Sequence, residues 1–413
     1  MSGMIKYEWK KIWTSRLTQI SVIGCSLFLV FCVCSSIFQI TATDENGQTV
    51  SGMTAVEVLQ NTQQRQELTQ DRVNEIVDQY LEYINNPDTS SNNEAYHYLS
   101  QEKYSTFYLP NKELLSLITN VYEEPGSGSG SDIKDVLENN AGKDFTQARL
   151  DRDQKYIQLL EENGKLTSIE ADYWEGEVKK ISEYQYGYHK GWDMILDALT
   201  WPVLIMMIIC IGIAPIFSGE YQSKCDSLIL CMKYGKSRLV STKIIVVWLF
   251  TTCVYWGITL IYSAVYLGLL GTDGADLPIQ LKYPAVSVGY HLSMAEGTMY
   301  ALILAYFFTL GIAGITLLMS AVLKNAYGVI IIAFLLIIIP TFLSPDTGGY
   351  TWSRMLSLLP SKIADFSFQS YTTYSIGKVV IKWPDMAMIV NGFGTIIFSA
   401  FSYWIFKKHQ VNK

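Results

Sequence analysis

Six long stretches of the chain carry no aspartate, glutamate, lysine or arginine. Each reaches the roughly 20 residues that an α-helix needs to cross the hydrocarbon core of a bilayer. Such stretches avoid water only by lying in lipid or against one another. The sequence therefore predicts an all-α membrane protein with six transmembrane helices. The six stretches are 17–43, 199–219, 244–272, 297–323, 325–345 and 386–406.

The overall net charge of −7 conceals an uneven distribution along the chain. Residues 41–198 hold 29 acidic and 13 basic residues, whereas the remainder is basic. Apolar residues recur at helical spacing within 56–83 and 145–184, which predicts two long helices in this acidic region. We expect a large, mainly helical extracellular insert between the first and second transmembrane helices. The expected division is 1–16 interfacial helix, 17–40 transmembrane helix 1, 41–198 insert, and 199–413 transmembrane helices 2 to 6.

Basic residues outside the insert predict the orientation of the chain. Short cytoplasmic loops of membrane proteins are enriched in lysine and arginine. An even number of spans puts both termini on one side, so we expect cytoplasmic N and C termini and a multi-pass protein of a bacterial plasma membrane. The basic residues flanking the spans on that side are Lys6, Lys10, Lys11, Arg16, Lys224, Lys233, Lys236, Arg238, Lys243, Lys324, Lys407, Lys408 and Lys413.

The segment before the first span has an amphipathic pattern. Apolar residues fall at i, i+4, i+7 and i+8, and lysines occupy another face. This pattern is typical of a helix that lies in the inner bilayer interface. A helical extension of the first span, ending in an aromatic belt, is the alternative. The apolar residues are Ile5, Trp9, Ile12 and Trp13.

No complete catalytic or metal-binding motif is present in the sequence. Gly235-Lys236-Ser237 resembles the end of a phosphate-binding loop, but Leu230 stands where that loop needs its first glycine. The four histidines and seven cysteines show no metal-ligand spacing. We therefore expect no enzymatic activity, no metal and no cofactor in this chain. The acidic composition gives no reason to expect nucleic-acid binding.

The segment near 220–235 instead predicts a short cytoplasmic helix between the second and third spans. Its small apolar surface includes Leu228, Leu230 and Met232, and Gly235 is expected to end it. Glu220 precedes it and is four residues from Lys224, the spacing of an exposed helical ion pair. A helix of this kind has nothing to catalyse, but a partner protein can bind it.

Several of these features together resemble the permeases of ABC-2 type exporters. The resemblance rests on Phe-Ser-Gly-Glu at 217–220, Gly-Lys-Ser-Arg at 235–238, the six-helix layout and the N-terminal amphipathic helix. It implies a cytoplasmic ABC ATPase subunit that binds ATP and Mg²⁺, and a second permease copy, as a homodimer or heterodimer. It also implies that the ATPase is coupled through Glu220, Lys224, Leu228, Leu230, Met232, Arg238 and Lys243. The large insert departs from many such permeases.

Two functions follow as hypotheses. The first is a permease subunit that exports a peptide-like or other amphipathic substrate, since charge-free spans suit apolar cargo better than ions. The second is a mechanotransmitting or sensory component in peptide resistance or immunity, whose external domain moves without cargo crossing. A peptide receptor without an ATPase would leave the short cytoplasmic helix unexplained. The acidic insert would attract cationic peptides, or it is a solvated surface; the sequence leaves both open.

Overall fold

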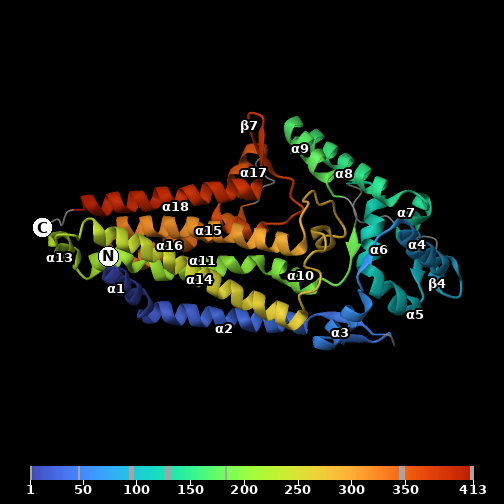
Figure 1. The fold of residues 1–413 in the computed structure, drawn as a ribbon, viewed down its shortest axis with the longest axis horizontal. Helices are drawn as coiled ribbons and strands as arrows, with labels where there is room; N and C mark the ends of the chain where they lie inside the picture. The colour runs from blue at the N-terminus through green and yellow to red at the C-terminus, as the bar shows by residue number, and fades with distance from the viewer. Residues whose placement is uncertain are drawn as a thin grey trace.

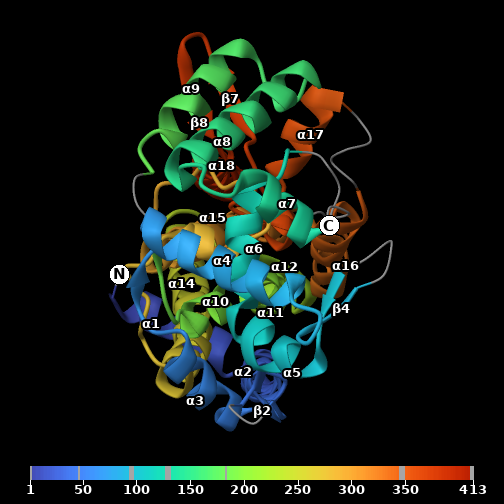
Figure 2. The ribbon, with the colours of Figure 1, turned by 90° about the vertical axis from the view of Figure 1, so that its right-hand side faces the viewer.

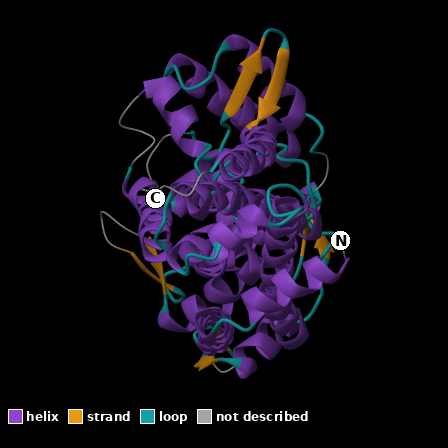
Figure 3. Cartoon of the chain, turned by 90° about the vertical axis from the view of Figure 1, so that its left-hand side faces the viewer, coloured by secondary structure: helices purple, strands orange, loops and turns teal. Residues whose placement is uncertain are grey.

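The structure is a computed structural model that describes residues 2–44, 47–92, 97–125, 132–181, 184–343 and 349–409. Helix predominates, and short strand pairs lie at the edges (Figure 3). Long helices run side by side through one part of the molecule, and shorter helices gather beyond one end of them (Figure 1). We call this the insert end. The opposite end, which holds α1 (Ser2–Trp13) and the last turns of α18, is called the terminal end.

Five helical stretches in the described part of the chain are long and apolar enough to cross a membrane. They agree with five of the six predicted spans, because a charge-free run of this length forms a helix whose side chains tolerate lipid. The second is built of three helices in series, with a 3-10 turn, Ala198–Thr200, and Pro215 at its breaks. The stretches are α2 (Arg16–Phe38), α10–α12 (Lys190–Asp197, Trp201–Ile213 and Pro215–Gln222), α14 (Arg238–Leu270), α15 (Met294–Val322) and α18 (Trp383–Lys408).

The remaining predicted span, 325–345, forms a shorter helix than expected. Helix α16 covers Ala326–Ile338 and continues as the 3-10 turn η4, Ile339–Phe342. At 1.5 Å per residue, 17 helical residues span only about 26 Å, less than the ~30 Å hydrocarbon core. Pro340 lies in η4 and cannot continue an α-helical hydrogen-bond ladder. The charge-free run 325–345 is therefore longer than the helix that it forms. Within the residues that the structure describes, five full-length spans are established, and not six.

Small residues bring the membrane helices close together. A Cβ atom added at Gly311 of α15 would lie 2.2 Å from Oδ1 of Asn391 on α18, and one at Gly212 of α11 would lie 2.5 Å from the ring of Phe250. No larger side chain fits either position without displacing its neighbour. Close approach at glycine is how helices gain van der Waals contact in lipid, where the hydrophobic effect does not drive helices together.

The insert is helical, but its helices are short. The prediction of two long helices over 56–83 and 145–184 is wrong, because turns divide each of these ranges into shorter helices. Gly164 (φ +66°) follows α8 in the left-handed region that favours glycine. The insert helices are α3 (Met53–Thr62), α4 (Gln70–Asn85), α5 (Gln101–Lys103), the π-helix η1 (Tyr104–Tyr108), α6 (Leu109–Tyr122), α7 (Ile133–Asn140), α8 (Phe145–Glu162) and α9 (Ser168–Val178).

Four two-stranded antiparallel sheets add minor β structure to the described fold. The pair β3–β6 joins distant parts of the insert and fixes the register Gln66 to Tyr186. The pairs are β1 (Thr41–Thr43) with β2 (Thr49–Ser51), β3 (Gln66–Glu67) with β6 (Gln185–Tyr186), β4 (Ser90–Asn92) with β5 (His97–Leu99), and β7 (Thr373–Ile376) with β8 (Val379–Lys382).

The insert is packed onto the loops that join the later membrane helices. Trp174 of α9 is completely buried, and its indole Nε1 donates a hydrogen bond of 2.8 Å to the carbonyl oxygen of Tyr371. Its ring also contacts Tyr290 and Tyr371 edge to face. Figure 2 shows α8 and α9 beside α17 (Gly349–Ser357) and β7, with α3 on the opposite side near the end of α2.

Candidate functional site

A buried group of four charged residues joins three helices at the terminal end. Lys243 of α14 has no exposed surface. Its ammonium Nζ donates to Glu8 Oε2 of α1 at 2.9 Å, to Glu220 Oε1 of α12 at 2.9 Å and to the carbonyl oxygen of Ile216 at 3.1 Å. Three acceptors match the three N–H donors of a lysine, so this buried charge is fully satisfied.

Lys11 completes the group from the solvent side. It lies one turn beyond Glu8 on α1 and donates a hydrogen bond to Glu220 Oε1. Burial by itself would lower the pKa of Lys11, but the hydrogen bond and charge of Glu220 raise it above its ordinary value. The group therefore contains two carboxylates and two ammonium ions. We call Glu8, Lys11, Glu220 and Lys243 the ion cluster.

Helix α1 is also held to α14 by its apolar face. Ile12 is buried, and the indole ring of Trp13 meets the ring of Phe250 at 5.5 Å between centroids. Trp9 packs against Trp13 at 5.9 Å. The apolar face expected to lie in the interface is thus turned at least partly toward protein. The chain is not helical at Ser15, so α1 is a separate helix and not an extension of α2.

The short helix expected between the second and third spans is present as α13, Asp226–Cys231. The side chain of Ile229 is buried beneath it, whereas Leu228 and Met232 are 70% and 53% exposed. Leu230 is half-buried. Large apolar side chains at such exposure on one short element favour a binding surface for another protein.

Two backbone features shape the turns around α13. A Cβ atom at Gly235 would lie 1.7 Å from the carbonyl oxygen of Ile229, so only glycine fits there. Lys224 adopts φ +54°, in the left-handed region, two residues before α13.

The predicted pairing of Lys224 with Glu220 is replaced by the ion cluster, since Glu220 points into the protein. Arg238 is exposed and its guanidinium lies 4.4 Å from the ring centre of Tyr234.

The last residues of α18 also reach this region. Asp226, the first residue of α13, lies 3.0 Å from Nε2 of His409, and the rings of Tyr221 and Phe406 stack. Helix α13 is therefore held to the end of α18 by Asp226, and α12 is held to α18 by the stacked rings. The resemblance identified neither Asp226 nor His409 as a site residue.

The sequence-predicted site residues fall into two groups. The structure brings Glu220 and Lys243 into direct contact, whereas Leu228, Met232 and Arg238 point outward some residues away. Glu8 and Lys11 were missed as members of the site. A signal existed for Glu8, because it is the only acidic residue among the first 43 residues.

Chemical catalysis has no support in this region. Gly235-Lys236-Ser237 lies in a turn between α13 and α14, so the element before it is a helix and not the strand that a phosphate-binding loop follows. Among the described residues, no three histidine, cysteine, aspartate or glutamate side chains gather in a way that could hold a metal ion. The ion cluster ties together α1, α12 and α14, the last two being the helices that flank α13 in the chain.

These features define a multi-pass helical membrane protein with an exposed short helix, α13, at its terminal end. The model of the ABC-2 family transporter protein family matches residues 16–407. The chain therefore belongs to the ABC-2 transporter family, whose members are membrane subunits that work with a partner ATPase. Searches of curated proteins and of solved structures gave no match.

Proposed function

We propose that this chain is the permease subunit of an ATP-driven exporter and moves a peptide-like or other amphipathic substrate out of the cell. A separate ATPase subunit binds ATP and Mg²⁺ and supplies the energy. The observation that carries the proposal is the ion cluster, whose members Glu220 and Lys243 flank α13 in the chain. The cluster holds α12 to α1 and to α14. Helix α13, which a partner can reach, follows α12 and is connected to both through it.

The path of force follows from these contacts. A partner that binds the exposed side chains of Leu228 and Met232 moves α13. Helix α12 precedes α13 and helix α14 follows it, each after a short connection. The buried Glu220–Lys243 pair makes α12 and α14 move together. Separating the pair would leave charges unpaired in a low-dielectric interior, which costs several kcal/mol. Motion of the ATPase is thereby passed to the second and third membrane helices.

The proposed orientation places the terminal end in the cytoplasm. Exposed basic residues gather there, namely Lys233, Lys236 and Arg238 near α13 and Lys407 and Lys408 on α18. The positive-inside rule then puts the insert outside the cell. Its excess of acidic residues favours encounter with cationic cargo. We infer a bacterial plasma membrane as the location.

A second permease copy, as homodimer or heterodimer, is proposed from the outer helices. Much of the surface of α2 and α16 is apolar and exposed in the single chain. Lipid covers part of such a surface. A partner chain placed against α2 and α16 would enclose a path lined by the first, second and fifth membrane helices, which carry no charge along their predicted spans.

The proposal is tested by reconstituting the purified chain in proteoliposomes with the ATPase that co-purifies with it from native membranes. We expect no ATP hydrolysis from the clean chain alone. With the ATPase we expect hydrolysis that is stimulated by cargo, and movement of a labelled amphipathic peptide across the bilayer. Hydrolysis by the chain alone would refute the assignment. Coupled hydrolysis without movement of any tested cargo would refute the export role.

A further inference from the structure

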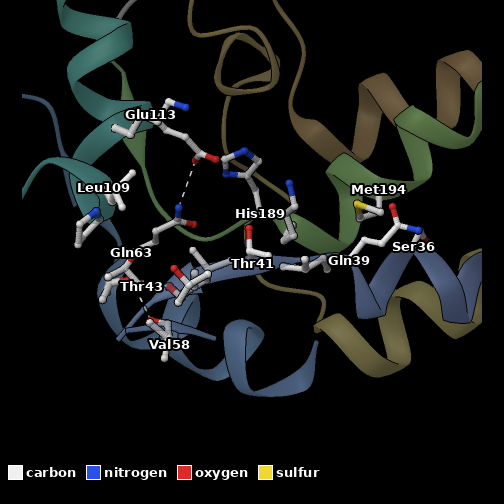
Figure 4. Close-up of a pocket in the computed structure, with 18 residues that line it drawn as sticks. Ser36, Gln39, Thr41, Thr43, Val58, Gln63, Leu109, Glu113, His189 and Met194 are labelled. Atoms are coloured by element: carbon white, nitrogen blue, oxygen red, sulfur yellow. Dashed lines mark hydrogen bonds between the residues drawn. The ribbon is translucent and has the colours of Figure 1, made fainter. Parts of the chain in front are cut away.

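A cavity of about 660 Å³ lies at the insert end, where the first membrane helix meets the insert. Residues of α2, α3, α6 and α10 line it, together with the segment that follows α2 (Figure 4). This volume is in the range of small-molecule and side-chain binding pockets. Its walls combine amide and hydroxyl groups with apolar surface, and they include Gln39, Thr41, Gln63, Glu113, His189 and Lys190.

Two hydrogen-bond acceptors in this cavity lack a cationic partner. The carboxylate of Glu113 accepts a hydrogen bond of 3.2 Å from the amide Nε2 of Gln63. Within the described parts of the chain, Glu113 forms no ion pair. His189 is only 5% exposed, and its Nδ1 lies 2.8 Å from the carbonyl oxygen of Gly187.

The tautomer of His189 follows from that contact. A carbonyl oxygen only accepts, so Nδ1 carries a hydrogen, and in the tautomer with one ring hydrogen Nε2 is an acceptor. No residue in the described ranges donates to Nε2. Figure 4 shows the His189 ring and the carboxylate of Glu113 facing the same space. An acceptor in the wall of a cavity can take a hydrogen bond from a ligand or from water that enters.

No lysine of the wall forms a salt bridge with Glu113 in the described residues, although Lys190 lies near enough for the two charges to interact. The ammonium of Lys190 lies 2.8 Å from Oδ2 of Asp193, and Lys282 pairs with Oδ1 of the same carboxylate. Lys282 also pairs with Asp197, so these four residues balance one another. Lys112 is exposed to solvent. The wall therefore holds a carboxylate that forms no salt bridge, beside an imidazole nitrogen, and both can accept hydrogen bonds from a positively charged donor.

We propose that this cavity binds the ammonium or guanidinium end of a basic side chain on a peptide. The charged N–H groups would donate to Glu113 and to His189 Nε2, and Gln39 and Thr41 offer hydrogen bonds to the peptide backbone. The excess of 29 acidic over 13 basic residues in 41–198 draws cationic peptides toward this end. The peptide's role as cargo rests on the proposed function, but its binding does not.

The test uses the full chain in phosphatidylcholine nanodiscs without any ATPase, and a tetralysine peptide with blocked ends as the probe. Isothermal titration at low salt measures binding. We expect Glu113→Gln to weaken binding at least tenfold, because it removes a charge-assisted hydrogen bond while leaving an acceptor for Gln63. The matched control is Glu162→Gln on α8, which removes the same charge from an exposed position of the insert. It should change affinity by less than twofold.

Acetylation of the lysines separates the ammonium from the rest of the peptide. We expect the acetylated probe to show at least tenfold weaker binding to the unmodified chain. Equal loss in Glu113→Gln and Glu162→Gln would mean general attraction by the acidic insert and would overturn the site. Loss of peptide binding when phosphatidylethanolamine replaces phosphatidylcholine would assign the cavity to a lipid headgroup and also overturn it. Normal binding with failed export would overturn the export role alone.

Discussion

Glu220 and Lys243 lie 23 residues apart in the sequence and meet at 2.9 Å between Oε1 and Nζ, with almost no solvent contact on either side chain. The helix that a partner can reach lies between them in the chain. The two ends of the α13 segment are thus fastened to each other inside the protein. A force on α13 cannot move α12 without also moving α14 or separating a buried pair of opposite charges.

The first prediction concerns this pair. Lys243→Met leaves Glu8 and Glu220 as buried carboxylates without their shared cation, and we expect a loss of about 3–5 kcal/mol in stability. Glu220→Gln keeps an acceptor for Lys243 but removes one negative charge, so we expect a smaller loss, about 1–3 kcal/mol. Thermal unfolding of the purified variants measures both effects.

A double-mutant cycle separates pairing from general damage. If the pair interacts as described, the double variant with Glu220→Gln and Lys243→Met loses less stability than the two single variants lose in total. Strict additivity would contradict the ion cluster. Where Glu220→Gln still assembles with the ATPase, we expect both cargo-stimulated hydrolysis and export to fall. Unchanged export in that complex would make Glu220 a structural residue only.

The second prediction concerns the exposed side chains of α13. Leu228→Ala and Met232→Ala should leave the melting temperature of the permease nearly unchanged, because both side chains already face solvent. They should weaken binding of the ATPase, measured by co-purification at graded salt and by surface plasmon resonance. Leu335→Ala on α16 is the control, since it shortens an exposed leucine on a membrane helix. Equal binding by all three variants would exclude α13 as the docking helix.

A third prediction tests which side of the membrane each end occupies. In a background without native cysteines, Glu162→Cys in the insert and Ser237→Cys before α14 introduce thiols at exposed positions. An impermeant maleimide added to intact cells should label the first and not the second. Permeabilised cells should label both, which confirms that Ser237→Cys is reactive. Labelling of Ser237→Cys in intact cells would reverse the proposed orientation.

The fourth prediction is a pH dependence at the contact between the insert and β8. Glu177 of α9 bonds to Lys382 at 2.8 Å and also pairs with Lys180. Burial would raise the pKa of Glu177, but the hydrogen bonds from these lysines lower it below its ordinary value. Because the folded pKa is the lower one, the pair stabilises fully above the unfolded pKa of about 4.3, and its contribution is lost as the pH falls through the folded value.

The measurement compares melting temperatures of the original chain and Glu177→Gln across pH. We expect the variant to melt lower at pH 7, and the difference to shrink below about pH 4 as the carboxylate in the original chain becomes protonated. Glu162→Gln, which carries no such pair, should show no pH-dependent difference. A difference in melting temperature that stays constant down to pH 3 would mean that the ionised Glu177 contributes nothing to this contact.

The membrane helices were predictable from sequence because charge in lipid is costly and its absence is easy to see over 20 residues. Helix α16 shows the limit of that rule, since Pro340 ends the α-helix before the charge-free run ends. In the insert, Gly164 marked a break between α8 and α9 that helical periodicity alone overlooked. The resemblance named Glu220 and Lys243, but their contact depends on how α12 packs against α14. That packing is set by tertiary structure, which no local pattern records.

The burial of Trp174 sets an order of events during synthesis. The partner of its indole, Tyr371, is 197 residues further along the chain. At 5–20 residues per second, a ribosome reaches that partner roughly 10 to 40 s after making the tryptophan. Until then the indole of Trp174 lacks the acceptor that it has in the folded protein, although most of the insert has already been synthesised. The packing of the insert around Trp174 is thus completed only after the ribosome has made segments far later in the sequence, so the insert cannot reach its final packing as an independent unit during synthesis.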